Sequence, residues 1–494
     1  MAIKIYNTLS RKKEELIPIE AGKVRMYLCG PTVYDYFHIG NARPFILFDV
    51  FRRYLKYREL DVKYVVNLTD IDDKIIKKSI EEKIPASDVA KKYTEAFKED
   101  IKKIGIKAAD EYPKATENIP EIIKLIEKLI ERGMAYSIDG EVYYSVKNFQ
   151  DYGKLSGKKI DELRSGARVE IDQRKKDPLD FSLWKAAKPG EPCWESPWGK
   201  GRPGWHIECS VMSMKYLGES IDIHAGGIDL VFPHHENEIA QSEGATGKPF
   251  VKYWMHNGFL NIDGEKMSKS LGNFFTAREI MEKYHPAVIR MFFLLKHYRS
   301  PINFSEDRIK EAQQALERII TTLQNISVEL DEKKSEIRET EFVLQESIEK
   351  IKREFLDEMD DDFNTAGAMA KVFDLVKEAN LILRKRSTID MLVDLPPDTG
   401  LSGRLTESEL AALLKIKSTI QEIDSFLNIL YYGDALKSTI DEDLLVQILI
   451  DVRRKLRETK QWALSDEIRD RLGEVGIILK DCSNKTTWQK KVKN

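Results

Sequence analysis

Two lysines that lie three positions apart, Lys266 and Lys269, are the residues of this sequence best suited to chemistry on a phosphate. They belong to the segment Lys-Met-Ser-Lys-Ser, which Gly264 precedes and Gly272 follows. The lysine ammonium group is a compact charge on a flexible stem, and flanking glycines allow a loop to close over a ligand. The segment therefore predicts a loop that brings two positive charges onto a polyphosphate.

A second group of candidate residues, His38, Gly40 and Asn41, lies far upstream at a predicted junction between a strand and a helix. Residues 24–29 read as a buried strand, apolar residues then recur at helical spacing, and a second strand follows over 62–67. Strand, helix and strand in this order build a parallel sheet, whose carboxyl edge binds nucleotides beside helix N-termini. The three residues either bind a phosphate or merely turn the chain.

Together the two motifs resemble the paired nucleotide-binding elements of class I aminoacyl-tRNA synthetases. The lysine segment matches the family pattern at all five positions. In the upstream motif, His-Ile-Gly-Asn, the family's second histidine is replaced by Asn41, whose amide can still donate a hydrogen bond to a phosphate or a ribose. The resemblance implies that His38, Gly40, Asn41, Lys266 and Lys269 bind ATP, and that His38 and the two lysines are catalytic.

Four cysteines in 494 residues are too few for a disulfide scaffold, and their wide spacing predicts reduced thiols. Cys29 ends the first predicted strand, and Cys209 lies far downstream. If a helix begins after Pro233, His234 and Glu238 share one face of it, since they are four positions apart. Two thiolates, an imidazole and a carboxylate would complete a four-ligand zinc site. The spacing alone leaves two other readings open, a buried core cysteine and a solvated helix pair.

The wider sequence resembles the cysteinyl-tRNA synthetase family. The similarity is carried by four strings: Cys-Gly-Pro-Thr-Val-Tyr-Asp from Cys29, Asn-Leu-Thr-Asp-Ile-Asp-Asp-Lys from Asn67, Gly-Trp-His-Ile-Glu-Cys from Gly204, and Phe-Pro-His-His-Glu-Asn-Glu from Phe232. The resemblance implies zinc ligands at Cys29, Cys209, His234 and Glu238.

The same resemblance assigns a substrate pocket to Thr69, Trp205, His224 and Asp229. Thr69 would supply a polar group and Trp205 an aromatic lid, unless both are core residues. His224 and Asp229 lie in the stretch His-Ala-Gly-Gly-Ile-Asp, where a backbone can approach a ligand closely. Asp229 would bind either the substrate ammonium group or the ribose hydroxyls, and the sequence does not decide between them.

The implied reaction has two steps, adenylation of L-cysteine by ATP and transfer of the cysteinyl group to the terminal ribose of tRNA(Cys). Mg²⁺ would arrive with ATP, held mainly by phosphate oxygens. One Zn²⁺ would bind the substrate sulfur and separate cysteine from serine, because zinc prefers a soft thiolate whereas size discriminates such near-isosteres poorly. No separate editing domain is then expected.

The composition, with 42% hydrophobic and 33% charged residues, predicts a globular protein without a membrane span or a signal peptide, and hence a cytoplasmic location. Because the net charge is only −3, RNA binding must rest on local patches. Residues 451–494 hold 12 Lys/Arg against 7 Asp/Glu, and Trp462 and Trp488 are among them. Aromatic rings beside basic residues can stack unpaired bases, although a solvated face would have the same composition.

The predicted fold is α/β, a Rossmann-like parallel-sheet catalytic domain with an insertion, followed by a helical bundle and a small C-terminal anticodon-binding module. Residues 1–120 and 200–250 would form the split catalytic domain, and 121–199 the insertion, which we expect to contact the acceptor end of tRNA. The lysine-loop junction, the helical bundle and the anticodon-binding module are then expected over 251–310, 311–400 and 404–494.

Two other functions compete with this interpretation. A ligase that joins activated cysteine to an amino sugar would share the catalytic pocket but needs no anticodon module, so the intact C-terminal third argues against it. A non-catalytic, zinc-stabilised RNA-binding protein would be expected to lose the lysine segment or the ligands, and both are present. The resemblance also suggests a monomer, which no residue fixes.

Overall fold

The computed structural model describes residues 2–159, 174–262, 265–266, 275–331, 344–390, 405–432, 442–482 and 485–490. The chain divides into two compact units, Met1–Leu430 and Tyr431–Asn494, which are described separately below. Within the described ranges, every helix is too short or too polar to cross a membrane.

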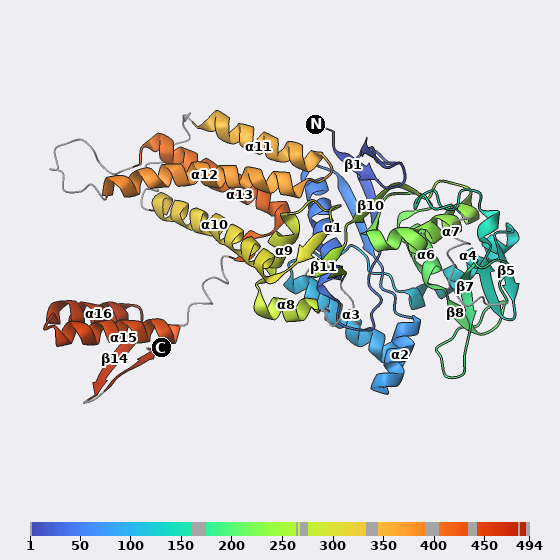
Figure 1. Cartoon of the computed structure of the whole chain (residues 1–494), viewed down its shortest axis with the longest axis horizontal. Coiled ribbons are helices and arrows are strands. Elements are labelled where there is room, and N and C mark those ends of the chain that lie inside the picture. Colours follow the sequence, from blue (N-terminus) through green and yellow to red (C-terminus); the bar gives the residue numbers. More distant parts are fainter. Residues whose placement is uncertain are drawn as a thin grey trace. The chain divides into compact units, whose positions relative to one another are not determined.

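A parallel sheet of four strands organises the first unit (Figure 1). Its order is β10-β9-β3-β4, and every neighbouring pair is parallel. The strands are β3 (Lys23–Leu28), β4 (Asp61–Val66), β9 (Ile221–Gly227) and β10 (Val251–Asn257). Helix α1 (Ile39–Tyr57) crosses from β3 to β4, while α6 (Trp205–Leu217) precedes β9 and α7 (Glu236–Thr246) follows it.

The Rossmann-like prediction is therefore confirmed, with the first two predicted strands each starting and ending one residue earlier than expected. Helix α1 begins just after His38, whose ring nitrogen Nδ1 accepts a hydrogen bond from the Asn41 N–H. Its apolar residues Phe45, Phe48 and Phe51 are buried, as their spacing predicts.

Smaller elements frame this sheet. A hairpin of β1 (Lys4–Asn7) and β2 (Lys12–Glu15) lies beside β10. After β4 the chain forms α2 (Asp73–Glu82), α3 (Ala86–Lys103) and the short turn η1 (Ala115–Asn118). Two further turns, η3 (Ile228–Leu230) and η4 (Val231–His235), join β9 to α7.

An antiparallel sheet separates β4 from β9 in the sequence, as expected of an insertion. Helix α4 (Ile119–Glu131) leads into it, and its strand order is β5-β6-β7-β8. The elements are β5 (Ala135–Ile138), β6 (Glu141–Tyr144), the turn η2 (Val146–Asn148), β7 (Phe181–Ala186) and β8 (Gly201–Pro203).

The lysine segment begins within a small sheet of order β12-β11-β13. Strand β11 (Leu260–Ile262) pairs with β12 (Glu265–Lys266) and with β13 (Ile302–Phe304), and α8 (Ala277–Lys283) and α9 (Pro286–Leu294) lie between β12 and β13 in the sequence. Lys266 thus ends β12, whereas Lys269 lies outside the described residues.

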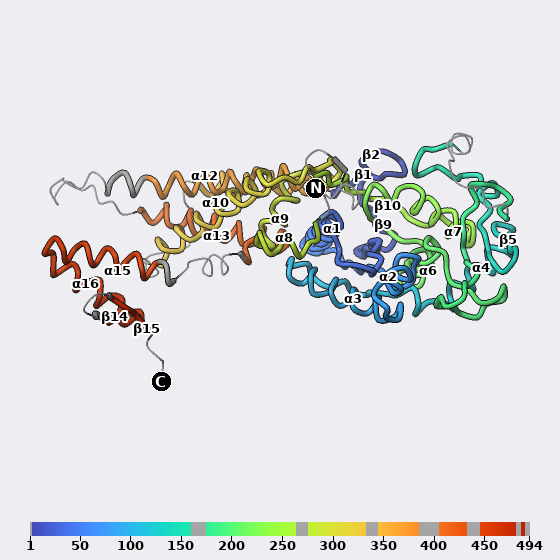
Figure 2. The backbone as a smooth tube through the Cα atoms, turned by 60° about the horizontal axis from the view of Figure 1, so that its bottom comes forward, coloured from blue at the N-terminus to red at the C-terminus, as the bar shows by residue number. Residues whose placement is uncertain are grey.

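Helices dominate the described residues after β13, as the helical spacing of apolar residues from about 305 to 385 predicts (Figure 2). The first unit ends in α10 (Glu306–Asp331), α11 (Gln345–Asp360), α12 (Thr365–Asp390) and α13 (Glu407–Leu427), and the turn η6 (Leu430–Tyr432) spans the boundary between the units. The second unit contains α15 (Glu442–Glu458), α16 (Trp462–Glu474) and an antiparallel hairpin of β14 (Ile477–Cys482) and β15 (Lys485–Lys490).

One buried arginine joins α1 to the two strands that flank the lysine segment in the sequence. The guanidinium of Arg43 donates to the carbonyls of Gly258 and Phe259, at 2.6 and 2.9 Å, just before β11. It also donates to those of Tyr298 and Ser300, at 3.0 and 2.6 Å, just before β13. Burial lowers the pKa of Arg43 to about 10, which still leaves the guanidinium charged at neutral pH. The carbonyl dipoles stabilise this buried charge.

We predict that Arg43→Met lowers the free energy of unfolding by about 3 kcal/mol, because it leaves several buried carbonyls without a donor. Arg43→Lys keeps the charge but reaches fewer carbonyls and should lose less. Urea unfolding followed by circular dichroism measures the difference. Lys56→Met removes an exposed cation from the same helix and should change stability by less than about 0.5 kcal/mol. Equal midpoints for Arg43→Met and this control would contradict the role of Arg43.

Candidate active site

The four predicted zinc ligands lie together in one buried cluster. Cys29 follows β3, Cys209 is on α6, His234 is in the turn before α7, and Glu238 is in the first turn of α7. The two Sγ atoms are 3.9 Å apart, and Glu238 Oε1 lies 3.6 Å from Cys29 Sγ and 3.1 Å from His234 Nε2. All four donor atoms lie within 4.8 Å of one another, so the cluster can hold a metal ion.

The spacing and chemistry of these donors suit zinc. Tetrahedral zinc with bonds of about 2.0–2.3 Å keeps its ligand atoms roughly 3.3–3.8 Å apart, close to the separations in the cluster. Two sulfurs, one imidazole and one carboxylate are also a soft donor set of the kind that zinc prefers. A second set meets the same distance limit with a single sulfur and comprises Cys29, His224, His235 and Glu238.

Electrostatics also favour a cation in this cluster. Burial raises the pKa of Cys29 and of Glu238, because a desolvated negative charge is unfavourable. A hydrogen bond from Cys29 lowers the pKa of Cys209 to about 7. Burial lowers the pKa of the His224 imidazole, which leaves that ring neutral near neutral pH. The cluster therefore gathers buried donors whose anionic forms a metal ion would stabilise.

Three further histidines surround the cluster, and sequence reasoning assigned them no role. His235 Nδ1 lies 2.7 Å from His256 Nε2, and His256 Nδ1 lies 2.8 Å from Thr8 Oγ1. On the other side, His206 Nδ1 lies 2.8 Å from His234 Nδ1. Such outer contacts orient ligand rings. The adjacency of His235 to His234 was an available signal, whereas His256 lies within a strand and has none.

A cavity of about 370 Å³ opens beside the metal cluster, at the carboxyl edge of the parallel sheet. Residues from the ends of β3, β9 and β10 line it together with the first turn of α1, where parallel sheets bind nucleotides. The sequence-predicted residues that line it are Cys29, His38, Gly40, Asn41, Trp205 and Asp229. Cys29 thus belongs both to the cavity wall and to the metal cluster.

The lysine segment is anchored beside this cavity at both of its ends. Before the segment, β11 is held to α1 through Arg43, as described above. After it, the Phe275 carbonyl accepts from the Ile39 N–H at 3.1 Å, and the Ala277 N–H donates to the Phe37 carbonyl at 2.9 Å. Both flanks of the segment therefore lie at the amino end of α1.

The remaining predicted pocket residues take different positions. Thr69 is buried beside the turn after β3, where its N–H donates to the Pro31 carbonyl at 3.2 Å, and it does not line the cavity. His224 is buried in β9 with its Nε2 3.4 Å from Cys29 Sγ, next to the metal cluster. Trp205 is 41% exposed, and its ring centroid lies 4.4 Å from that of His234. This position allows Trp205 to cover the cluster.

Comparison with known proteins first identifies the class. A family model described as the tRNA synthetases class I (C) catalytic domain matches residues 15–314, and a DALR domain model matches 354–430. The structure resembles methionyl-tRNA synthetase of Mycobacterium tuberculosis bound by methionyl-adenylate, with a TM-score of 0.62 over 82% of this chain and 92% of that chain, at 14% identity. The fold is that of the class I aminoacyl-tRNA synthetases.

Sequence relatives narrow the class to one family. The chain is 50% identical to a cysteine–tRNA ligase of Carboxydothermus hydrogenoformans, across 99% of this chain and 100% of the relative. It is 49% identical to a cysteine–tRNA ligase of Anoxybacillus flavithermus over the same shares. The chain belongs to the cysteine–tRNA ligase family, also called cysteinyl-tRNA synthetases.

We predict that the purified protein carries about one equivalent of bound metal and that Cys209→Ser removes most of it, because the substitution replaces a soft ligand with a poor one. Inductively coupled plasma mass spectrometry measures the content. Cys193→Ser changes an exposed thiol outside the cluster and should retain the metal.

A second pair of variants separates the two possible donor sets. His234→Asn should lose the metal, whereas His235→Asn leaves two sulfurs, one imidazole and the Glu238 carboxylate in place. Metal loss in His235→Asn alone would assign the ion to the other set.

Proposed function

We propose that the cluster of Cys29, Cys209, His234 and Glu238 holds one Zn²⁺ and that the thiolate of substrate L-cysteine binds this ion directly. The observation that carries the proposal is the dual position of Cys29, which is part of the metal cluster and of the cavity wall. A substrate whose sulfur lies on the metal would extend its carboxylate into the cavity. Bound zinc would supply selectivity, because it stabilises a thiolate far better than a serine hydroxyl.

Serine should therefore be a very poor substrate even without an editing domain. We expect kcat/KM for serine-dependent pyrophosphate exchange to be at least about 10,000-fold below that for cysteine, beyond what a pocket that measures size achieves. Steady-state exchange with purified amino acids measures the ratio. A ratio near 100 would be the value for selection by size alone and would contradict selection by the metal.

We further propose that ATP occupies the cavity, with its triphosphate between the first turn of α1 and the lysine segment. His38, Gly40 and Asn41 would contact the phosphates from one side, and Lys266 and Lys269 would close from the other. Anchoring of both flanks of the lysine segment at the amino end of α1 supports this arrangement. Mg²⁺ would accompany the phosphates as an oxygen-bound ion.

In the first step the cysteine carboxylate oxygen attacks the α-phosphorus of ATP, and the bond to pyrophosphate breaks. The lysine charges would stabilise the negative charge that moves onto pyrophosphate. In the second step a terminal ribose hydroxyl of tRNA(Cys) attacks the adenylate carbonyl, and AMP leaves. No protein side chain forms a covalent bond in this scheme. Asp229 lines the cavity and would bind either the substrate ammonium group or the ribose of ATP.

Lys269→Ala tests this assignment. It should lower kcat for cysteine-dependent pyrophosphate exchange by about 100-fold or more, the usual effect of losing one group that stabilises transition-state charge. The KM for cysteine should change little, since the lysine would not contact the amino acid. Lys283→Ala removes an exposed lysine of α8 and serves as the matched control. Exchange at the wild-type rate in Lys269→Ala would refute the role.

Transfer of labelled cysteine to tRNA tests the whole proposal. Stable charging of tRNA(Cys) is the expected result. Cysteine-dependent pyrophosphate exchange without charging would favour the amino-sugar ligase, and absence of both would favour a non-catalytic RNA-binding protein. Identity of about 50% along 99% of the chain to cysteine–tRNA ligases supports the first outcome.

The remaining proposals concern the setting of the enzyme. We propose that it acts as a monomer in the cytoplasm, where the buried Cys29 and Cys209 would stay reduced. We assign anticodon recognition to the second unit, whose α16 carries Trp462 at 54% exposure near basic residues of α15.

A further inference from the structure

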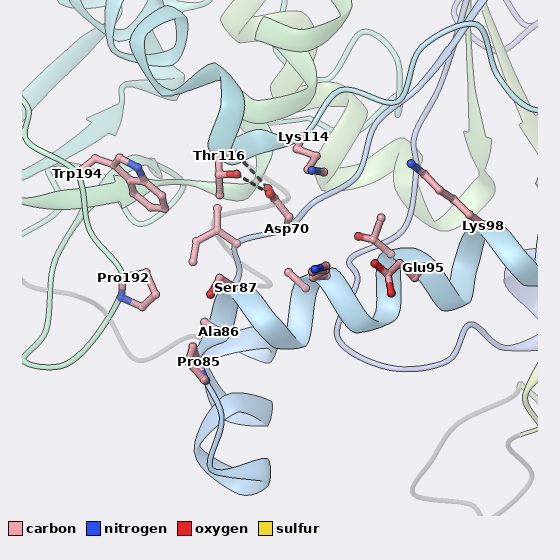
Figure 3. Close-up of a pocket in the computed structure, with 14 residues that line it drawn as sticks. Asp70, Pro85, Ala86, Ser87, Glu95, Lys98, Lys114, Thr116, Pro192 and Trp194 are labelled. Atoms are coloured by element: carbon pink, nitrogen blue, oxygen red, sulfur yellow. Dashed lines mark hydrogen bonds between the residues drawn. The ribbon is translucent and has the colours of Figure 1, made fainter.

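A second hollow, of about 630 Å³, lies beside the loop that follows β4, separate from the cavity proposed for ATP (Figure 3). Four separate segments enclose it: the loop at Asp70, the first three turns of α3, the chain at Lys114 and Thr116, and the insertion loop at Trp194. Among the residues that the structure describes, none that we assign to the metal ion or to ATP lines it. Pockets of this size hold small organic ligands.

The hollow has an apolar aromatic end and a basic end. Figure 3 shows Trp194 and Pro192 at one end, and Lys114 and Lys98 toward the other. Along the floor, α3 presents the small residues Ala86, Ala90 and Thr94 at intervals of four residues, and Lys98 continues this series. Lys91 and Glu95 line the hollow from the neighbouring row of the same helix. The space therefore lies between an indole ring and the ammonium groups of Lys98 and Lys114, and Glu95 and Asp70 add two carboxylates to its lining. Lys114 Nζ also lies 2.9 Å from Glu117 Oε1.

The aromatic end is held firmly in place. The Trp194 N–H donates to the Gly201 carbonyl at 2.8 Å, and the Gly201 N–H donates back to the Trp194 carbonyl at 3.0 Å. Arg202, next to Gly201, is buried and pairs with Asp73 at the start of α2, while Lys185 Nζ lies 2.8 Å from the same carboxylate. These contacts fix the backbone at Trp194 relative to the start of α2, just after the loop that follows β4.

That loop is a wall shared with the proposed active site. On the side of the hollow, the Asp70 carboxylate accepts from the Thr116 N–H and Oγ1 at 3.0 and 2.5 Å. On the other side, the Thr69 N–H and carbonyl bond to the Pro31 carbonyl and the Val33 N–H, at 3.2 and 3.1 Å. Pro31 lines the nucleotide cavity. A ligand in the hollow would thus lie one loop away from the reacting groups.

An unpaired nucleotide has the shape and charge that these features require. Its base is a flat ring that stacks on tryptophan, and its phosphate carries the negative charge that lysines attract. A peptide with an acidic group could use the lysines but would not need the indole platform. RNA is also the one large substrate of the proposed reaction, and its single-stranded end must reach the neighbouring cavity.

We propose that this hollow binds an unpaired nucleotide of the substrate tRNA's 3′ strand, with the base on Trp194 and the phosphate at Lys98 and Lys114. The inference rests on the proposed function and deepens it by naming a site for RNA outside the catalytic cavity. Trp194 and Lys98 are then residues for tRNA affinity and take no part in amino-acid activation.

The test compares tRNA charging with pyrophosphate exchange in full-length protein. Trp194→Ala should raise the KM for tRNA(Cys) about tenfold, the order of one lost base–aromatic stack. Trp194→Phe should restore most of the affinity, since it keeps an aromatic face. Lys98→Glu should also raise this KM. Cysteine-dependent pyrophosphate exchange, which needs no tRNA, should be unchanged in all three variants.

Lys92→Glu is the matched control for the lysine variant. It makes the same charge change on the same helix, but Lys92 pairs with Glu82 and does not line the hollow. An unchanged KM for tRNA in both Trp194→Ala and Lys98→Glu would overturn the proposal, as would equal effects of Lys98→Glu and Lys92→Glu. Absence of cysteine-dependent pyrophosphate exchange in the wild-type protein would instead count against the proposed function.

A binding experiment distinguishes an RNA strand from a free nucleotide. The chain has seven tryptophans, so the fluorescence titration is read as the difference between wild type and Trp194→Phe. A short oligoribonucleotide with the 3′ sequence of the tRNA should give a Trp194-dependent change, and AMP at the same concentration should not. A Trp194-dependent response to AMP alone would assign the hollow to a free nucleotide and overturn the RNA proposal.

Discussion

The geometry of the site depends on the hydrogen bonds that the buried guanidinium of Arg43 donates to backbone carbonyls. Its hydrogen bonds reach carbonyls just before β11 and just before β13, so one side chain fixes two strands relative to α1. A hydrogen bond to a charged group contributes about 1.5–3 kcal/mol. Several such hydrogen bonds together contribute more to stability than most single apolar contacts do, and they also fix the direction in which the strands leave α1. The lysine segment lies between these two strands in the sequence, and its flanks at Phe259 and Phe275 both hydrogen-bond to residues of α1.

Close approach of the backbone is the second constraint, and it brings the buried Cys/His/Glu cluster next to the cavity at the carboxyl edge of the sheet. At Gly30 a side chain would overlap the carbonyl oxygen of Asn67, so only glycine lets the chain turn directly after Cys29. Cys29 can therefore supply a sulfur to the cluster and also line the cavity. Gly226 has a similar role, because a Cβ there would lie 2.9 Å from the ring of His235. The cluster is compact because glycines remove the side chains that would separate its donors.

Sequence reasoning succeeded for the strand–helix–strand unit, which followed from apolar periodicity. The structure gathers Cys29, Cys209, His234 and Glu238 in one buried cluster that can hold a metal ion. The resemblance implied this set, and the spacing of the residues alone did not decide it. Sequence reasoning gave Arg43 no role, because the partners of Arg43 are backbone carbonyls, which have no signature in a sequence. The resemblance assigned Thr69 to the substrate pocket, and that assignment stays a prediction; the structure adds that its backbone bonds to the turn at Pro31 and Val33. The hollow at Trp194 depends on four distant segments and could only be found from their arrangement.

Helix α1 also carries the connection from the site to the helical region. In its middle, buried Asp49 lies 3.3 Å from Arg290 of α9, whose guanidinium donates to the Leu427 carbonyl at the end of α13 at 2.8 Å. Near its end, the Tyr54 hydroxyl donates to Asp360 of α11 at 2.6 Å. A buried ion pair stabilises little by itself, yet removal of one partner leaves an unpaired charge, so such contacts tolerate few alternative arrangements. The helix that presents its amino end to the nucleotide cavity is thereby locked along its length to the helices of the same unit. Catalytic geometry and bundle packing are consequently properties of one rigid element, which explains why the anchoring of α1 matters as much to the site as the residues that line it.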